Sequence, residues 1–437
     1  MKKFIRTIRN IFAIEELRER ILNTLGFLVI FRLGSFVVLP GVDPSKLKGS
    51  ASGILGLLDT FLGGAFSNAS IFGLGVMPYI SASIVLQLLT VAVPYFQKMQ
   101  KEGESGRKKI NQITRVLTIF ITIFQSSAYL TGAVPAEAIV VSRSLFMFSS
   151  MIILTAGTIF IMWLGERITE KGIGNGISML IMIGIISSFP GALIAEVTTK
   201  GMSGALLFII EIVALFFVVL AVVALTQAVR RVPVQYAKQV VGNRVYGGQR
   251  QYIPLKVNAA GVMPIIFAQS LMFLPALLAG LWADQSDIAS YIGSTFANYL
   301  SWQYNLVFGV LIVLFTFFYT AITINPTQIA DDMKRNGGFI PGVKPGKQTS
   351  EYIDTILTKI TLPGSVFLAI VAILPAFATI AGVGGQFAQF YGGTSLLIMV
   401  GVILDTLQQI ESYLLMRHYE GLMKSGKIKG RSSVAVA

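Results

Sequence analysis

Long apolar runs alternate with shorter polar gaps along almost the whole chain. Each run is close to or longer than the roughly 20 residues that an α-helix needs to cross a bilayer core. Backbone groups in lipid must be hydrogen-bonded within their own segment, as a helix allows. The pattern predicts an all-α polytopic membrane protein whose ten spans lie at residues 22–40, 71–94, 114–134, 148–165, 177–195, 205–228, 259–282, 305–324, 356–380 and 394–416.

Basic residues gather in every second gap. Most of the 35 Lys and Arg residues lie in alternate gaps, beginning with the N-terminal tail. Positively charged loops resist translocation and stay in the cytoplasm. We therefore expect a multi-pass inner-membrane protein with cytoplasmic tails at 1–21 and 417–437. The first run is too long for a cleaved signal peptide and is interpreted as retained.

Charge and composition narrow the chemistry. A mean hydropathy of +0.72 together with a net charge of +14 fits such a protein. The chain has no cysteine, and we interpret its single histidine, His418, as a solvated tail residue. These absences leave no residues for thiolate or imidazole metal sites or for a His-dependent triad. The glycine-rich stretch Gly172–Gly176 lacks a dinucleotide-fold context and is interpreted as a tight turn. We expect no enzyme activity, no catalytic residue, no metal and no cofactor.

The spans divide five and five around an external loop near residues 190–203. This division predicts two halves, 22–195 and 205–416. The tetrapeptide Gly-Val-Met-Pro occurs at 75–78 and again at 261–264, in the second span of each half. Because these spans run in opposite directions, the match fits an inverted-topology repeat. Two ordinary proline kinks are an equally good interpretation of the tetrapeptide.

The external stretch 56–70, GLLDTFLGGAFSNAS, is too apolar for a solvated loop and too short to span. Its large apolar residues recur near helical spacing, interrupted by Gly63 and Gly64. A short re-entrant helix inside a protein-lined cavity fits this pattern. A surface amphipathic helix is the alternative.

Two long loops, 229–257 and 325–355, carry basic residues among tyrosines and prolines. Their length exceeds what a connection between helices needs, and long structured loops are usually functional. Basic and aromatic side chains can bind RNA phosphates or an acidic protein face. Enforcing membrane topology is the alternative. The candidate residues are Arg230, Arg231, Lys238, Arg244, Arg250, Lys256, Lys334, Arg335, Lys344 and Lys347.

Charged residues inside the spans are few. Arg32, Glu211 and Asp405 are the main ones. An ion-coupled transporter usually places ionisable groups near the midplane. The proline-bearing helices offer Val76, Ile80 and Ile266 instead. This composition favours an apolar pathway, which blocks ions by dewetting and can yield to a larger passenger.

Five stretches are distinctive: 70–83 (SIFGLGVMPYISAS), 101–107 (KEGESGR), 172–178 (GIGNGIS), 254–258 (PLKVN) and 392–397 (GGTSLL). They resemble the SecY family, the central subunit of the bacterial protein-conducting channel. The matches cover nearly every part of the chain in family order.

The resemblance implies a fold of two inverted, pseudo-symmetric five-helix halves that form a clamshell around a pore. It also implies a plug at 61–70, a ring of aliphatic side chains at the constriction and a lateral gate. The plug includes Phe61, Gly63, Gly64, Phe66 and Ser70. The ring resembles Val76, Ile80, Ile181, Ile185, Ile266 and Ile398, and the polar gate positions resemble Ser81, Gln125 and Asn258.

The implied activity is translocation of unfolded secretory chains and sideways release of hydrophobic segments into lipid. The implied partners are SecE, SecG, the SecA ATPase, the ribosome, signal sequences and lipids. One position departs from the family pattern: Lys344 stands where the family usually has arginine. Lysine keeps the positive charge but cannot form the bidentate hydrogen bonds of a guanidinium group. Similarly, Asn243-Arg244 stands where paired arginines are frequent. An inverted-repeat transporter is the competing class, supported only by Arg32 and Asp405. An intramembrane protease lacks a nucleophile–base pair.

Overall fold

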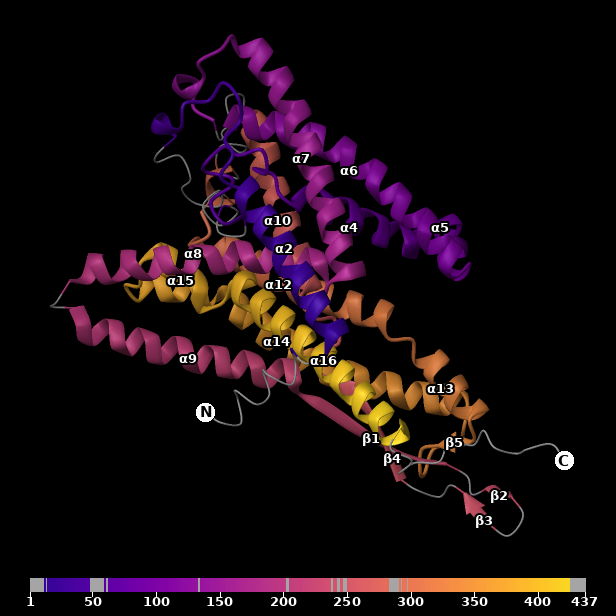
Figure 1. Cartoon of the computed structure of the whole chain (residues 1–437). Coiled ribbons are helices and arrows are strands. Elements are labelled where there is room, and N and C mark those ends of the chain that lie inside the picture. The colour runs from indigo at the N-terminus through magenta and orange to yellow at the C-terminus, as the bar shows by residue number, and fades with distance from the viewer. Residues whose placement is uncertain are drawn as a thin grey trace. The chain divides into compact units, whose positions relative to one another are not determined.

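The computed structural model describes residues 12, 14–47, 59, 62–132, 134–201, 204–236, 239–241, 244–246, 250–282, 291, 293–296 and 298–424. Every predicted run contains one long helix, so the all-α class is confirmed (Figure 1). These helices are α2 (Glu15–Gly34), α4 (Met77–Ala92), α6 (Glu104–Gly132), α7 (Arg143–Lys171), α8 (Gly176–Lys200), α9 (Ala205–Gln227), α10 (Met263–Trp282), α12 (Trp302–Thr323), α14 (Lys347–Ile380) and α16 (Gly393–Lys424).

Among the described residues, seven helices are long and apolar enough to cross a membrane. An eighth span results if α4 and α5 (Pro94–Lys101), which are bent by 102° at the break between them, count as one. In α10 only Met263–Met272 qualifies, as a shorter apolar helix. Helix α2 is not among the seven. The count of ten spans therefore stays a prediction.

Several predicted boundaries differ from the helices: α6 begins at Glu104 and not at 114, α14 begins at Lys347 and not at 356, and the first two runs differ as well. The first run was expected at 22–40, but α2 begins at Glu15 and ends at Gly34. Its first turns carry charged residues, which a hydropathy run excludes. The second run was expected at 71–94, but α4 covers only 77–92 because the preceding residues form turns. Val93, which precedes Pro94, is extended (φ −111°, ψ 120°), as residues before proline usually are.

The repeated tetrapeptide is a helix start in both halves, and neither copy is a kink. Pro78 lies in the first turn of α4, and Pro264 is the second residue of α10. A proline there removes an N–H that has no partner within the helix anyway. Gly75 (φ +53°) and Gly261 (φ +64°) take the left-handed backbone two residues before each helix. The two copies thus share one local conformation, as a structural repeat requires.

The chain divides into two compact units, residues 1–188 with 402–437, and residues 189–401. In the first unit the loop between α7 and α8 is the predicted tight turn. Its backbone N–H groups are used internally, with Ile173 donating to Thr24 Oγ1 (3.0 Å), Gly174 to Gln409 Oε1 (2.8 Å) and Gly176 to Thr169 Oγ1 (2.9 Å). These bonds leave the turn unsuited to phosphate. Short 3-10 turns in this unit are η1 (Pro44–Lys46) and η2 (Ala136–Ala138).

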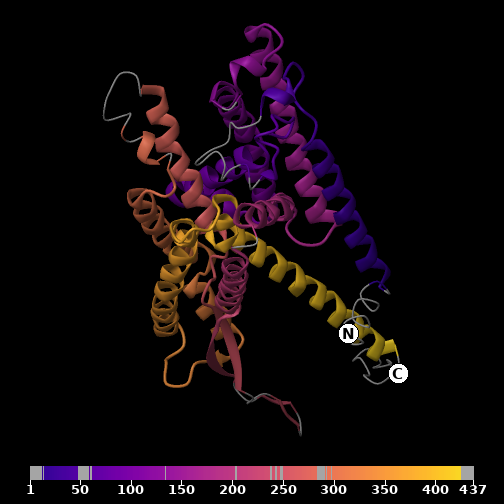
Figure 2. The ribbon, with the colours of Figure 1, turned by 90° about the vertical axis from the view of Figure 1, so that its left-hand side faces the viewer.

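The second unit contains a sheet that the sequence analysis did not predict. Strands β1 (Val229–Tyr236), β4 (Arg250–Lys256) and β5 (Gly338–Phe339) form an antiparallel sheet in the order β4-β1-β5. Figures 1 and 2 show β1 continuing from the end of α9. Strands β2 (Gln239–Val241) and β3 (Arg244–Tyr246) pair separately. The unit also includes α13 (Pro326–Arg335), α15 (Gly385–Ala388) and η4 (Gln389–Tyr391).

A buried ion-pair triad joins α8 and α9 in the second unit. Lys200 Nζ lies 2.9 Å from Glu196 Oε1 and also bonds Glu211 Oε1. Glu196 Oε2 accepts from the backbone N–H of Gly384 (3.0 Å), which follows α14. Glu196 and Glu211 are only 3% and 12% exposed at their side chains. Pairing of this kind is what buried charges need.

Candidate functional site

The apolar segment before α4 forms a compact series of turns. Phe61 lies outside the described residues. From Gly63 to Ala69 the chain is turns, not the predicted regular helix. Gly63 (φ +61°) and Gly64 (φ +87°) have left-handed backbone that a right-handed helix cannot contain. Asp59 ties the turns together, accepting from Gly64 N–H at its carbonyl (3.1 Å) and from Ser67 N–H at Oδ1 (2.9 Å).

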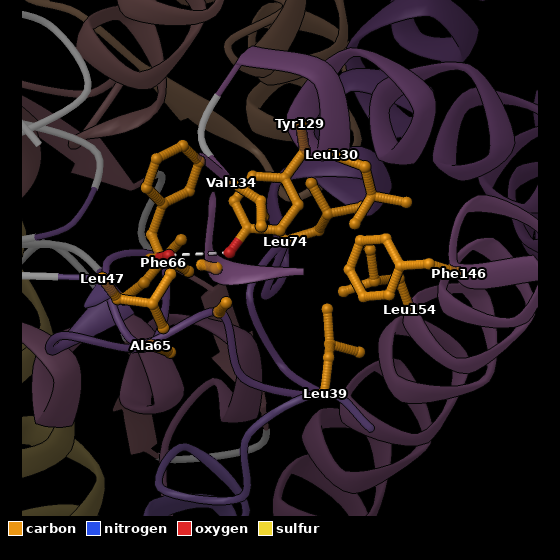
Figure 3. Close-up of a cluster of buried hydrophobic side chains, with 13 residues drawn as sticks. Leu39, Leu47, Ala65, Phe66, Leu74, Tyr129, Leu130, Val134, Phe146 and Leu154 are labelled. Carbon is orange, nitrogen blue, oxygen red and sulfur yellow. Dashed lines mark hydrogen bonds between the residues drawn. The ribbon is translucent and has the colours of Figure 1, made fainter. Parts of the chain in front are cut away.

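This segment is buried against the rest of the first unit. Leu62, Ala65, Phe66 and Ser70 are each less than 9% exposed, which excludes a surface amphipathic helix at these residues. The Phe66 ring meets the Tyr129 ring edge-on, with centroids 4.7 Å apart. Figure 3 shows this pair among the other buried side chains, Leu39, Leu47, Leu74, Leu130, Val134, Phe146 and Leu154.

The four ring candidates of the first unit lie on α8 and at the start of α4. Val76, Ile80, Ile181 and Ile185 are all buried. The segment of turns lies beside both helices. A Cβ on Gly75, next to Val76, would collide with Leu62, and a Cβ on Gly63 would lie 3.0 Å from Gly184 Cα, next to Ile185. Leu62 and Gly63 therefore fill the space next to these ring candidates.

The other two ring candidates face each other in the second unit. Helices α10 and α16 touch at two levels, where Thr394 donates to Gln269 and where Gly401 lies against Val262. The two contacting positions are seven residues apart in each chain segment. Their order is reversed between the segments, so the helices are antiparallel. Ile266 and Ile398 lie between them, three and four residues from each contact, on the facing sides. Ile398 is buried and Ile266 is half-buried.

The predicted gate residues have few partners. Ser81 Oγ donates to the carbonyl of Met77 in its own helix (3.1 Å), and Gln125 is half-buried on α6. Asn258, just before α10, is 6% exposed, and its Oδ1 is buried without a hydrogen bond. An unpaired buried carbonyl oxygen is uncommon and costs about 1–3 kcal/mol. Asn258 is thus ready to accept a hydrogen bond from a new partner.

The two basic loops fold into one body. Strand β5 from the second loop pairs with β1 from the first, with Tyr236 opposite Gly338. Both loops contribute to one apolar core: Val232, Val234, Leu255, Met333, Ile340, Ile353 and Leu357. The alternation of Val232 and Val234, and of Ile253 and Leu255, is the period-two signal that could have predicted these strands. Pro233 and Pro254 stand between these apolar residues, and proline within a run argues against a strand.

One face of the β1–β4 strand pair carries basic and aromatic side chains. Register pairs Arg231 with Pro254 and Pro233 with Tyr252 on the face opposite the core. Arg231 is exposed, and Tyr252 is 56% exposed. Arg230, Lys334, Arg335 and Lys344 are exposed as well. Lys238 and the side chain of Arg244 lie outside the described residues.

The charged groups inside the spans do not build an ion site. Arg32 donates to the backbone carbonyl of Gly63 (2.6 Å), Asp405 is exposed, and Glu211 pairs with Lys200. In the part of the chain that the structure describes, no three His, Cys, Asp or Glu side chains lie close enough to hold a metal ion. Together with at least seven helices that are long and apolar enough to cross a membrane among the described residues, the fold is that of a multi-pass helical membrane protein.

Comparison with known proteins identifies the channel. The model of the SecY family matches residues 70–407. The protein translocase subunit SecY of Streptomyces griseus is 46% identical over 430 residues, covering 94% of this chain and 98% of that protein. The chain belongs to the SecY family. It is a protein-translocation channel subunit in the membrane and not an enzyme.

Solved structures share the fold. One, described as the structure of a protein conducting channel, covers 90% of this chain and 92% of its own with a TM-score of 0.65 at 18% identity. Sec61 in a canine ribosome-channel complex from the endoplasmic reticulum covers the same shares with a TM-score of 0.62 at 17% identity. At these identities the likeness shows the fold alone.

Proposed function

We propose that this chain forms the pore of a Sec-type translocase in a bacterial cytoplasmic membrane. It moves unfolded secretory polypeptides across the membrane and releases hydrophobic segments sideways into lipid. The observation that carries the proposal is the buried apolar segment of turns, which lies against two helices that bear aliphatic ring candidates. In this proposal residues 61–70 are the plug, and the halves 22–195 and 205–416 are the clamshell.

The seal is apolar in this proposal. Val76, Ile80, Ile181, Ile185, Ile266 and Ile398 form the ring. Aliphatic side chains exclude water by dewetting, bind no particular peptide and deform around a passing chain. The facing positions of Ile266 and Ile398 on α10 and α16 support their joint role.

The lateral gate uses a few polar side chains. Ser81, Gln125 and Asn258 can form hydrogen bonds across the proposed seam, and each such bond would contribute about 0.6–2 kcal/mol in a membrane. This range biases the gate shut without fixing it. The unpaired Asn258 Oδ1 supports this role, because a buried acceptor needs a donor.

The basic body of β1, β4, β5 and α13 is the docking surface for the energy source. The channel has no catalysis of its own, so the SecA ATPase or the translating ribosome supplies the energy, and SecE and SecG complete the complex. Exposed Arg231 beside Tyr252 can bind RNA phosphates and bases or an acidic protein face. Both tails, 1–21 and 417–437, lie with this body in the cytoplasm. The description of the canine complex supports the ribosome as a partner.

The seal is tested by resting ion conductance of the reconstituted complex in planar bilayers. Deleting 61–70, or changing Ile266 or Ile398 to Asn, lowers the dewetting barrier and should raise conductance several-fold. Translocation of chains with defective signal sequences should rise in parallel. Ile403→Asn is the control, because Ile403 is 42% exposed on the same helix as Ile398. Parental conductance in all three seal variants would reject the proposed constriction.

A further inference from the structure

Arg32 is a basic side chain in the last turn of α2, and no ion pair found among the described residues includes it. It is half-buried. Its Nη1 donates to the carbonyl of Gly63 (2.6 Å), and its guanidinium lies over the Phe36 ring, 4.6 Å from the centroid. An intramembrane charge is expensive and needs a partner. The polar partner of Arg32 is the backbone of the segment of turns.

Tyr129 on α6 makes a second bond of the same kind. Its hydroxyl donates to the carbonyl of Phe66 (2.7 Å), and its ring packs edge-on against the Phe66 ring (Figure 3). Tyr129 is 5% exposed. Two side chains from two helices thus bond two carbonyls that are three residues apart.

Glycine at position 63 leaves the space that the Arg32 bond occupies. A Cβ there would lie 2.7 Å from Arg32 Nη1 and 2.5 Å from Ser187 Oγ, both too close. A Cβ on Gly64, which has left-handed backbone as well, would meet only Asn68 Nδ2, at 3.6 Å. Alanine substitutions at the two glycines can therefore distinguish the effect of backbone strain from the effect of losing the Arg32 contact.

The segment is anchored separately at its C-terminal end. Leu39 N–H donates to the Ala69 carbonyl and Ile71 N–H to the Val37 carbonyl, both at 2.9 Å. Ala69 has a φ of +44°, which is unusual for a residue other than glycine. The N–H groups of Gly64 and Ser67 both donate to Asp59, which links these residues to one another. The turns are anchored near Ala69 and held at Gly63 and Phe66.

We propose that Arg32 and Tyr129 are a latch that holds the plug in its closed position through the Gly63 and Phe66 carbonyls. The inference rests on the proposed function of 61–70 as the plug. Both bonds go to backbone oxygens, so the latch is independent of plug side chains apart from the space left at Gly63. When the plug leaves, water can satisfy both carbonyls, and opening breaks two bonds while the anchor at Ala69 persists. Arg32 and Tyr129 act by holding the plug in position.

Resting conductance of the complete translocase tests the latch. Tyr129→Phe keeps the ring contact and removes one neutral donor, so we expect about a fivefold rise in plug-out openings. Arg32→Met removes a charged donor and should raise them at least about tenfold. Gly63→Ala should match Arg32→Met and exceed Gly64→Ala, which carries similar strain without the collision. Arg143→Met, at an exposed arginine of α7, is the control and should be parental.

Plug position gives a second readout. The chain has no cysteine, so spin labels at Asn68 and Thr131, both exposed, report the plug-to-α6 distance by electron paramagnetic resonance without background. We expect one narrow distance in the parent and a second, longer population in Arg32→Met and Tyr129→Phe. An unchanged distance in both variants would overturn the latch. This readout stays decisive even if deleting 61–70 leaves conductance parental, a result that would reject the plug as a seal.

Discussion

In the proposed function, exposed basic side chains such as Lys344 bind the energy-supplying partner. Lys344 is exposed, and its carbonyl accepts from Thr349 Oγ1 (2.9 Å), so the loop conformation does not depend on its side chain. Arginine would add a planar fork that binds carboxylates and phosphates bidentately. An exposed ammonium contributes by charge, and exposed charges mainly affect association rate and salt dependence.

Charge alone should account for the role of Lys344. Lys344→Glu should weaken SecA or ribosome binding to the reconstituted channel up to about fivefold, as expected of an exposed ion pair. Arg244→Glu should act in the same direction, and raised ionic strength should reduce the effect of both. Lys344→Arg should leave affinity unchanged. A clear gain in affinity with arginine would show that fork geometry matters.

At the scale of elements, the two basic loops act as one body because they share a core. Met333 of α13 is 5% exposed and packs in that core with the strands. Truncating a buried methionine costs about 2–5 kcal/mol. Met333→Ala should therefore loosen the sheet and weaken partner binding without changing any charge.

Hydrogen exchange of β1 and β4 measures this effect directly. We expect faster exchange in Met333→Ala and parental exchange in Met416→Ala, where the side chain is 54% exposed. If exchange accelerates but partner affinity stays parental, the docking surface does not require the folded sheet.

The triad around Lys200 should stabilise the α8–α9 pair. Lys200→Met would leave the Glu196 and Glu211 carboxylates buried without their cation. Removing one partner of a buried pair costs about 3–5 kcal/mol. Thermal unfolding in detergent should show a lower Tm for Lys200→Met and partial recovery when Glu211→Gln is added. An unchanged Tm would mean that water reaches the carboxylates.

Hydropathy predicted every long helix but not the irregular parts. The turns at 63–76 escaped because glycines and apolar residues there extend the hydrophobic run into α4. The sheet escaped because β5 and β1 pair across about a hundred residues of chain, which a local pattern does not show. The Arg32–Gly63 bond joins a side chain to a backbone carbonyl 31 residues away, so only the tertiary arrangement determines it. Because the sequence does not show this bond, Arg32 taken from the sequence alone supports the competing transporter class.

At the scale of the whole molecule, the topology follows from charge. A reporter fused at Gly337, an exposed glycine after α13, or at Gly247 should behave as cytoplasmic, and one at Ser286 as external. Both positions 247 and 286 lie outside the described residues. A cytoplasmic signal at Ser286 would break the ten-span topology and the inverted repeat with it.

We expect the two halves to part along a seam between α4 and α10, the two helices at whose starts the Gly-Val-Met-Pro segments lie. Cysteines introduced at Ser81 on α4 and at Asn258 before α10 can be crosslinked without background, since the chain has no cysteine. A short crosslinker should stop both secretion and membrane insertion, because the clamshell cannot open. A long flexible crosslinker should restore transport. If the short link forms efficiently and secretion continues at the parental rate, the gate does not lie at this seam and the clamshell mechanism is wrong for this chain.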